Sequence, residues 1–322
     1  LYGDGVSAQA CASSIIQLPS KPSFPMQSST QAASRPFRVD VPDQTLAQIK
    51  DRVANYPWHE MPDDGGWSYG SNLDYMRELC EYWVHGFDWR KQEAAINRLS
   101  HWVAPVDGID LHYIHEKGSG AKPMPLLLSH GWPGSIVEFL DIIEPLAHPE
   151  RFGGKVEDAF DVIAPSLPGF GFSGRPPRPY GPRKIAGVFD ALMTDHLGYE
   201  GYMAQGGDWG AAISSWLGFD HAPACRAIHI NCLTMRSATG PQSPQEKGWA
   251  ERFVREQLVE DGYRTQQATK PQTLSYAMMD SPVGVAAWII EKFHGWSDIE
   301  GDDIESVHSK DVLLTNIMVY IV

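Results

Sequence analysis

Cysteine, positive charge and long apolar runs are all scarce in this chain of 322 residues. Its four cysteines have no CxxC spacing, so they indicate neither a disulfide framework nor a zinc site and fit a reducing, cytoplasmic compartment best. Lysine and arginine total 26 against 40 aspartate and glutamate, and the net charge of −14 argues against nucleic acid as a partner. The most apolar end, residues 312–322, is about half as long as a spanning helix, so we expect no membrane-spanning segment.

The first hundred residues change character near Phe37. Residues 1–36 are dominated by Ser, Gln, Ala and Pro without an apolar period, which predicts a disordered tail. The tail lacks a basic region before its apolar stretch, so a signal peptide is a poor interpretation. Apolar residues then recur at helical spacing within residues 37–100, which predicts helices that must pack against another body.

From about Trp102 the apolar period becomes that of strands. Candidate strands lie at residues 109–115, 125–129, 159–165, 202–205 and 226–231, with helix-length segments between several of them. Strands that alternate with helices predict a parallel α/β sheet over residues 101–235. After Asn231 the strands stop, and residues 236–322 are predicted to form helices with loops.

The strongest chemical signal is Gly206-Gly-Asp-Trp-Gly210, directly after a candidate strand and before a helix rich in small residues. This pattern is typical of a nucleophile elbow, in which the flanking glycines permit a strained turn from strand to helix. Asp208 would be the nucleophile. Alone, the pattern fits a surface aspartate in a glycine turn equally well. Its position in the strand order is what favours a nucleophile elbow.

A second loop, His130-Gly-Trp-Pro133, follows the candidate strand at 125–129, where an α/β-hydrolase builds its oxyanion hole. The backbone N–H groups of Trp132 and Trp209 are expected to converge on one oxygen, while the two indoles, His130 and Pro133 form pocket wall. Alone, this loop could be a rigid turn with a structural histidine. A Pro/Gly-rich loop follows a third strand, and the three loops in this order predict an α/β-hydrolase.

Through these motifs, and through residues 269–273 and 280–293, the chain from about Phe37 onward resembles the microsomal-type epoxide hydrolases. The resemblance implies an α/β-hydrolase core (101–235) with an N-terminal helical wrapping region (37–100) and a helical cap (236–322). It also implies that a small apolar epoxide is opened to a vicinal diol through an ester on Asp208, without metal or organic cofactor. It selects Tyr263 as the acid that protonates the leaving oxygen, with Tyr276 as the rival.

The chemistry of the residues agrees with this resemblance. A carboxylate is already anionic at neutral pH and can displace a leaving group at an sp³ carbon, which suits epoxides or alkyl halides. An epoxide oxygen leaves as an alkoxide, and a neutral phenol can donate the proton that it needs. A haloalkane dehalogenase is therefore the alternative enzyme, and a non-catalytic binding protein or truncated fragment is the alternative outside catalysis.

The sequence departs from the family because it stops inside the predicted cap, and no histidine after Asp208 lies in the Gly-Gly-His context of the family's general base. We expect the C-terminal part of the core to be missing and the chain to be inactive or limited to a single turnover. No general base or triad acid is assigned. The histidines after Asp208, each expected in the cap or a loop, are His221, His229, His294 and His308.

Overall fold

The computed structural model describes residues 33–62, 65–232 and 239–322. Most of the predicted tail, residues 1–32, lies outside the described residues. The last two residues of that tail were predicted wrongly, because Arg35 begins strand β1 (Arg35–Phe37). This strand pairs antiparallel with β2 (His101–Val106), and Arg35 lies opposite Val103. Pairing with a distant strand orders these residues, although the local composition favours disorder.

The described strands form one sheet in the order β1-β2-β3-β5-β4-β6-β7. The remaining strands are β3 (Ile109–Glu116), β4 (Met124–Ser129), β5 (Phe160–Pro165), β6 (Tyr202–Gly206) and β7 (Cys225–Ile230). Strands β5, β4, β6 and β7 are parallel to one another, as predicted. The first three strands pair antiparallel, so the prediction of a parallel sheet was wrong for them.

A tight hairpin explains part of this difference. Asp107 and Gly108 join β2 to β3 with φ angles of 52° and 79°, and Val106 pairs with Ile109 across the turn. Two successive positive φ angles match the right-handed twist of the flanking strands, and Asp-Gly is a preferred sequence for such a turn. An Asp-Gly pair between apolar residues was therefore the signal for β2, which the sequence analysis missed.

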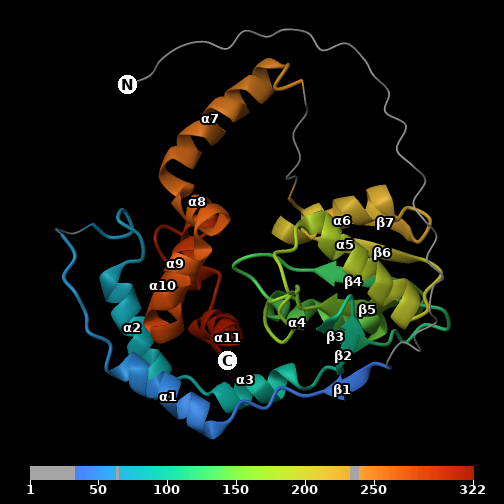
Figure 1. Cartoon of the computed structure of the whole chain (residues 1–322), viewed down its shortest axis with the longest axis horizontal. Helices are drawn as coiled ribbons and strands as arrows, with labels where there is room; N and C mark the ends of the chain where they lie inside the picture. The colour runs from blue at the N-terminus through green and yellow to red at the C-terminus, as the bar shows by residue number, and fades with distance from the viewer. Residues whose placement is uncertain (1–32, 63–64, 233–238) are drawn as a thin grey trace. The chain divides into compact units, whose positions relative to one another are not determined.

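Helices cover both faces of the sheet (Figure 1). One face packs against α5 (Pro182–Ala191), the π-turn η4 (Leu192–His196) and α6 (Asp208–Asp220). The other face packs against η1 (Ile136–Phe139) and α4 (Leu140–Ala147). Alternate strand residues explain both contacts, because Leu127 belongs to the first core cluster whereas Leu126 and Leu128 belong to the second. Short 3-10 turns are η2 (Pro149–Phe152), η3 (Val156–Asp158) and η5 (Ile304–Ser306).

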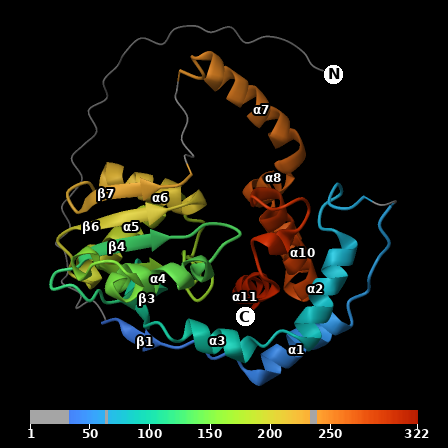
Figure 2. The same cartoon turned by 180° about the vertical axis from the view of Figure 1, so that it is seen from behind.

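The N-terminal helices pack on the C-terminal ones, and Figure 2 shows α1 and α2 beside α10 from behind. Helices α1 (Asp43–Ala54), α2 (Leu73–His85) and α3 (Trp89–Ile96) share a third core cluster with α10 (Pro282–Trp296) and α11 (Lys310–Ile321). Burial of one large aliphatic side chain contributes roughly 1.5–3 kcal/mol, and Leu79, Ile290 and Leu314 are all fully buried here. Helices α10 and α11 therefore provide the surface against which the apolar faces of the N-terminal helices are buried.

Three more helices precede α10, namely α7 (Pro244–Glu260), α8 (Gly262–Thr269) and α9 (Pro271–Asp280). Helix α7 starts with a capping box, in which Ser243 and Glu246 each bond the other's backbone. None of the helices in the described ranges has both the length and the apolar character needed to cross a bilayer. The division of the chain at residues 100 and 235 stays a prediction.

Candidate active site

A strained turn places Asp208 between the end of β6 and the start of α6. Its φ angle is +48°, in the left-handed region that side chains other than glycine rarely adopt. The turn also needs glycine at position 210, because a Cβ there would lie 1.8 Å from the carbonyl oxygen of Ser129 on β4. Close packing of α6 on the sheet therefore fixes the position of Asp208, as the elbow pattern predicts.

Backbone N–H groups hold the carboxylate of Asp208 from two loops. The N–H of Trp132 donates to Oδ1 at 2.9 Å, and the N–H of Trp209 bonds the same carboxylate. Burial raises the pKa of Asp208 above its usual value, although these two hydrogen bonds lower it in part. The N–H groups of the two residues predicted to form an oxyanion hole thus converge on the carboxyl group of Asp208.

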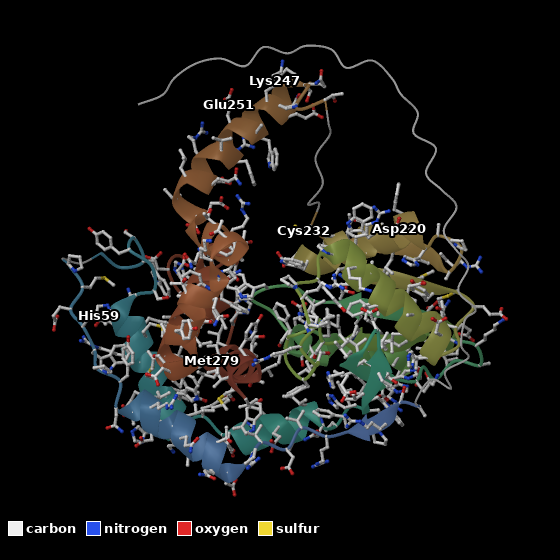
Figure 3. The ribbon with its side chains drawn as sticks, viewed as in Figure 1. His59, Asp220, Cys232, Lys247, Glu251 and Met279 are labelled. Carbon is white, nitrogen blue, oxygen red and sulfur yellow. The ribbon has the colours of Figure 1, made fainter. Side chains whose placement is uncertain are left out.

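Asp208 lies at the wall of a cavity of about 900 Å³ that Trp132 and Pro133 also line. Apolar side chains of β4, β6 and β7 form much of this wall, and Cys232, labelled in Figure 3, lines it just after β7 in the chain. The indole of Trp209 is 42% exposed and does not line the cavity, so its role as pocket wall was predicted wrongly.

His130 is the second correction, because its ring faces the protein interior rather than the cavity. Its Nε2 accepts the N–H of Leu167 at 3.1 Å, and its Nδ1 lies 3.1 Å from the carbonyl oxygen of Gly131. Burial lowers the pKa of His130 to about 4, so the ring is neutral at pH 7. The histidine connects the loop of residues 130–135, called the oxyanion loop below, to the loop after β5, which is the structural role that the sequence left open.

Tyr263 on α8 packs over the oxyanion loop. Its ring stacks on Trp132 with centroids 5.0 Å apart and an interplanar angle of 9°, and it meets Trp296 edge to face at 5.0 Å. Burial, with a further contribution from the negative charge of Asp208, raises the pKa of Tyr263, so the phenol keeps its proton at neutral pH. The rival Tyr276 is 73% exposed, and neither tyrosine lines the cavity, so the stacking on Trp132 is what favours Tyr263.

Two charged residues of the cavity were missed by sequence reasoning. Glu138 on η1 has an exposed side chain that lines the cavity, yet desolvation and then the charge of Asp208 raise its pKa to about 8. Lys292 on α10 is almost fully buried, and its Nζ lies 4.9 Å from the ring centroid of Tyr263 and 3.2 Å from Glu260. No spacing signal exists for either, because packing alone brings Glu138 near Asp208 and Lys292 to Tyr263.

The histidines after Asp208 fall into two groups. His229 lies on strand β7, so its predicted place in the cap or a loop was wrong. His229 and His308 line the cavity, and His308 Nε2 lies 2.8 Å from the hydroxyl oxygen of Ser297. Neither ring has a carboxylate within 4.0 Å among the described residues. The other two are placed elsewhere, since His221 pairs with Asp190 at 2.8 Å and His294 stacks on Trp67.

Comparisons with known proteins agree with this geometry. Residues 34–139 match the family described as "Epoxide hydrolase N terminus", and residues 124–273 match "alpha/beta hydrolase fold". Epoxide hydrolase 1 of Sus scrofa is 34% identical over 313 residues, which cover 89% of this chain and 69% of that protein. The chain belongs to the epoxide hydrolase family.

Other members of the epoxide hydrolase family are similar as well. A protein of Stigmatella aurantiaca is 41% identical over 289 residues, covering 88% of this chain and 65% of its own length. The crystal structure of juvenile hormone epoxide hydrolase from the silkworm Bombyx mori has a TM-score of 0.81 at 28% identity, over 91% of this chain and 74% of that one. The chain spans about two thirds of the length of these first curated relatives.

Proposed function

We propose that this chain opens a small apolar epoxide by forming an ester on Asp208. The observation that carries the proposal is the contact between Asp208 Oδ1 and the N–H of Trp132, with the phenol of Tyr263 stacked on the same tryptophan. One carboxylate and an oxyanion donor thus meet at a largely apolar cavity, and the candidate acid stacks on the tryptophan of its wall.

The first half-reaction is an alkylation. Because Oδ1 is held by Trp132, Oδ2 is the oxygen that attacks a ring carbon of the epoxide. The carbon–oxygen bond of the ring breaks as the ester bond forms, and Tyr263 gives its proton to the leaving oxygen. The raised pKa of Tyr263 keeps that proton available at neutral pH.

The second half-reaction is hydrolysis of the ester. Water adds to the ester carbonyl, and the negative charge develops on Oδ1, where the N–H groups of Trp132 and Trp209 stabilise it. Collapse of this intermediate releases the diol and restores the carboxylate. This step needs a base for the attacking water, and the only histidines among the described cavity residues are His229 and His308.

The test is incubation of the chain with a reactive apolar epoxide, followed by intact-mass and peptide-mass analysis. We expect one substrate mass per chain on the peptide that contains Asp208, and little sustained diol production. Asp208→Asn is the matched control, since asparagine tolerates the positive φ angle at this position better than alanine. An adduct elsewhere, or one that persists in Asp208→Asn, would contradict the proposal.

Four further outcomes would each support a specific conclusion. Tyr263→Phe should slow adduct formation by roughly 10- to 10³-fold, the range of one acid catalyst, whereas the exposed Tyr276→Phe should not. Multiple turnover would show that a base is present, and His229→Gln and His308→Gln would then identify it. Halide release from a haloalkane without an epoxide adduct would favour the dehalogenase alternative, and binding without an adduct would favour a binding protein.

A further inference from the structure

The oxyanion loop is held from behind by helix α11. Asn316 Nδ2 donates to the carbonyl oxygen of Pro133 at 2.8 Å. The hydroxyl of Tyr320 donates to the carbonyl oxygen of Gly134 at 2.7 Å. The hydroxyl of Ser135 donates to Asn316 Oδ1 at 2.7 Å. Three consecutive loop residues are therefore bonded to two side chains that lie four residues apart, on one face of α11.

Asn316 is an unusual residue for its position. It is 3% exposed within a helix whose residues 313–319 are all buried, and an unpaired buried amide costs about 1–3 kcal/mol. Here both ends of the amide are paired, and both partners lie outside the helix. The neighbouring Thr315 differs, because its hydroxyl donates to the carbonyl oxygen of Asp311 in the same helix.

These contacts reach the nucleophile through one residue. Pro133 directly follows Trp132, whose N–H donates to Asp208 Oδ1. We propose that Asn316 and Tyr320 are positioning residues, which hold the oxyanion loop so that the Trp132 N–H stays in contact with Asp208. An effect of these two residues on catalysis rests on the proposed function, whereas their effect on the position of the loop does not.

Loss of either contact should loosen the loop and weaken the Trp132–Asp208 hydrogen bond. That bond stabilises the ionised carboxylate against burial, so the pKa of Asp208 should rise further when the bond weakens. Hydrogen bonds to charged groups are strong, and we expect a rise of about half a pH unit or more. A side chain that only stabilises the fold would leave this titration unchanged.

The first arm of the experiment needs no substrate. The Asp208 carboxyl is titrated by ¹³C NMR in the full chain and in Tyr320→Phe, Asn316→Ala and the matched control Thr315→Val. Tyr320→Phe removes one hydroxyl and keeps the ring, so it tests the contact even if Asn316→Ala unfolds. We expect the midpoint to rise in the two loop-contact variants and to stay unchanged in Thr315→Val. An unchanged midpoint in folded Tyr320→Phe would overturn the proposal.

The second arm measures adduct formation with the reactive epoxide as a function of pH. Both loop-contact variants should form the Asp208 adduct about 10-fold more slowly, with the acid limb of the rate profile moved to higher pH. If the parent chain forms no adduct but the NMR midpoints move as expected, the proposed function fails and the positioning role stands. Equal rates and equal acid limbs in the parent chain and Tyr320→Phe would overturn the positioning role alone.

Discussion

The backbone N–H of Trp132 lies 2.9 Å from Oδ1 of Asp208, although 76 positions separate the two residues. Both follow parallel strands, β4 and β6, which are neighbours in the sheet. Because the carboxyl ends of parallel strands meet at one edge, the two loops are brought together by the topology alone. Four predictions follow from how closely these loops and the residues around them are packed.

Gly131 should be essential for catalysis without being essential for folding. A Cβ at this position would lie 2.2 Å from Asp208 Oδ1 and 2.5 Å from Asp208 Cβ, so Gly131→Ala must displace the side chain of Asp208. We expect adduct formation to fall at least 10²-fold, with a loss of stability of about 1–3 kcal/mol from overpacking. Rates of adduct formation and urea unfolding curves measure the two effects.

Gly187 in α5 provides the matched glycine control. Nothing lies within 4 Å of a Cβ built there, and the residue is inside a helix. Gly187→Ala should leave the adduct rate unchanged and raise the free energy of unfolding by roughly 0.5–1 kcal/mol. A normal adduct rate in Gly131→Ala would show that the carboxylate can work from another position.

Asp208→Asn should stabilise the fold while it abolishes adduct formation. Burial raises the pKa of Asp208 above its unfolded value, so the folded state is penalised once the pH exceeds that unfolded value. At pH 7 the asparagine variant should therefore have the higher free energy of unfolding. As the pH falls toward 4 the aspartate takes up its proton and the difference should shrink.

Urea unfolding at pH 7 and pH 4 measures this difference, with Asp208→Ala as the comparison. Alanine also removes the charge, but it tolerates the φ angle of +48° less well than asparagine. We expect the asparagine variant to be more stable than the alanine variant by roughly 1 kcal/mol. A parent chain that is more stable than Asp208→Asn at pH 7 would contradict the inferred penalty on the charged nucleophile.

How far the sequence predicts this molecule depends on the range of the interaction. Strands β3 to β7 and the elbow at Asp208 follow from local patterns of apolar residues and glycine. Strand β1 was missed because its order comes from pairing with β2, some 65 positions away. Long-range contacts of this kind leave no trace in local composition.

The same distinction applies to the site. Asp208, Trp132 and Tyr263 belong to recognisable motifs, and the structure brings all three together. Glu138 and Asn316 belong to none, since their contacts depend on how η1 and α11 pack against the loop. His130 was misplaced for a related reason: the motif gives its position in the chain but not the direction of its ring.

Glu138→Gln should stabilise the protein at alkaline pH. Desolvation and the charge of Asp208 raise the pKa of Glu138 from its unfolded value of 4.5 to about 8. The folded state therefore binds more protons than the unfolded state between these two values, and stability falls as the pH rises through that window. Glutamine resembles the protonated form and removes this loss.

Free energies of unfolding at pH 5 and pH 8.5 test this prediction. The advantage of Glu138→Gln over the parent chain should be larger at pH 8.5 than at pH 5. Glu144→Gln is a suitable control, because Glu144 lies on the adjoining helix α4 with a side chain that is 52% exposed. An equal effect of Glu138→Gln at both pH values would show that water reaches this carboxyl group freely.

Buried histidines should make the fold sensitive to acid. Burial lowers the pKa of His130 and of His115 to about 4, and it also lowers the pKa values of His101 and His112. Each group is neutral in both states above its unfolded pKa of 6.5. Below that pH the unfolded chain takes up protons that the folded chain refuses, so stability falls until the folded pKa is reached.

His130→Asn measures how much His130 alone contributes to this dependence of stability on pH. Asparagine can offer an oxygen to the N–H of Leu167, as Nε2 of His130 does, and it does not titrate. Between about pH 6 and pH 4.5, the slope of stability against pH should become less steep by up to about 1.4 kcal/mol per pH unit, the value for one proton. His59→Asn serves as the control for the same substitution at the surface, because His59 is exposed (Figure 3). Urea unfolding at half-unit pH steps measures the slopes, and an identical slope in His130→Asn and the parent chain would mean that His130 is protonated in the fold.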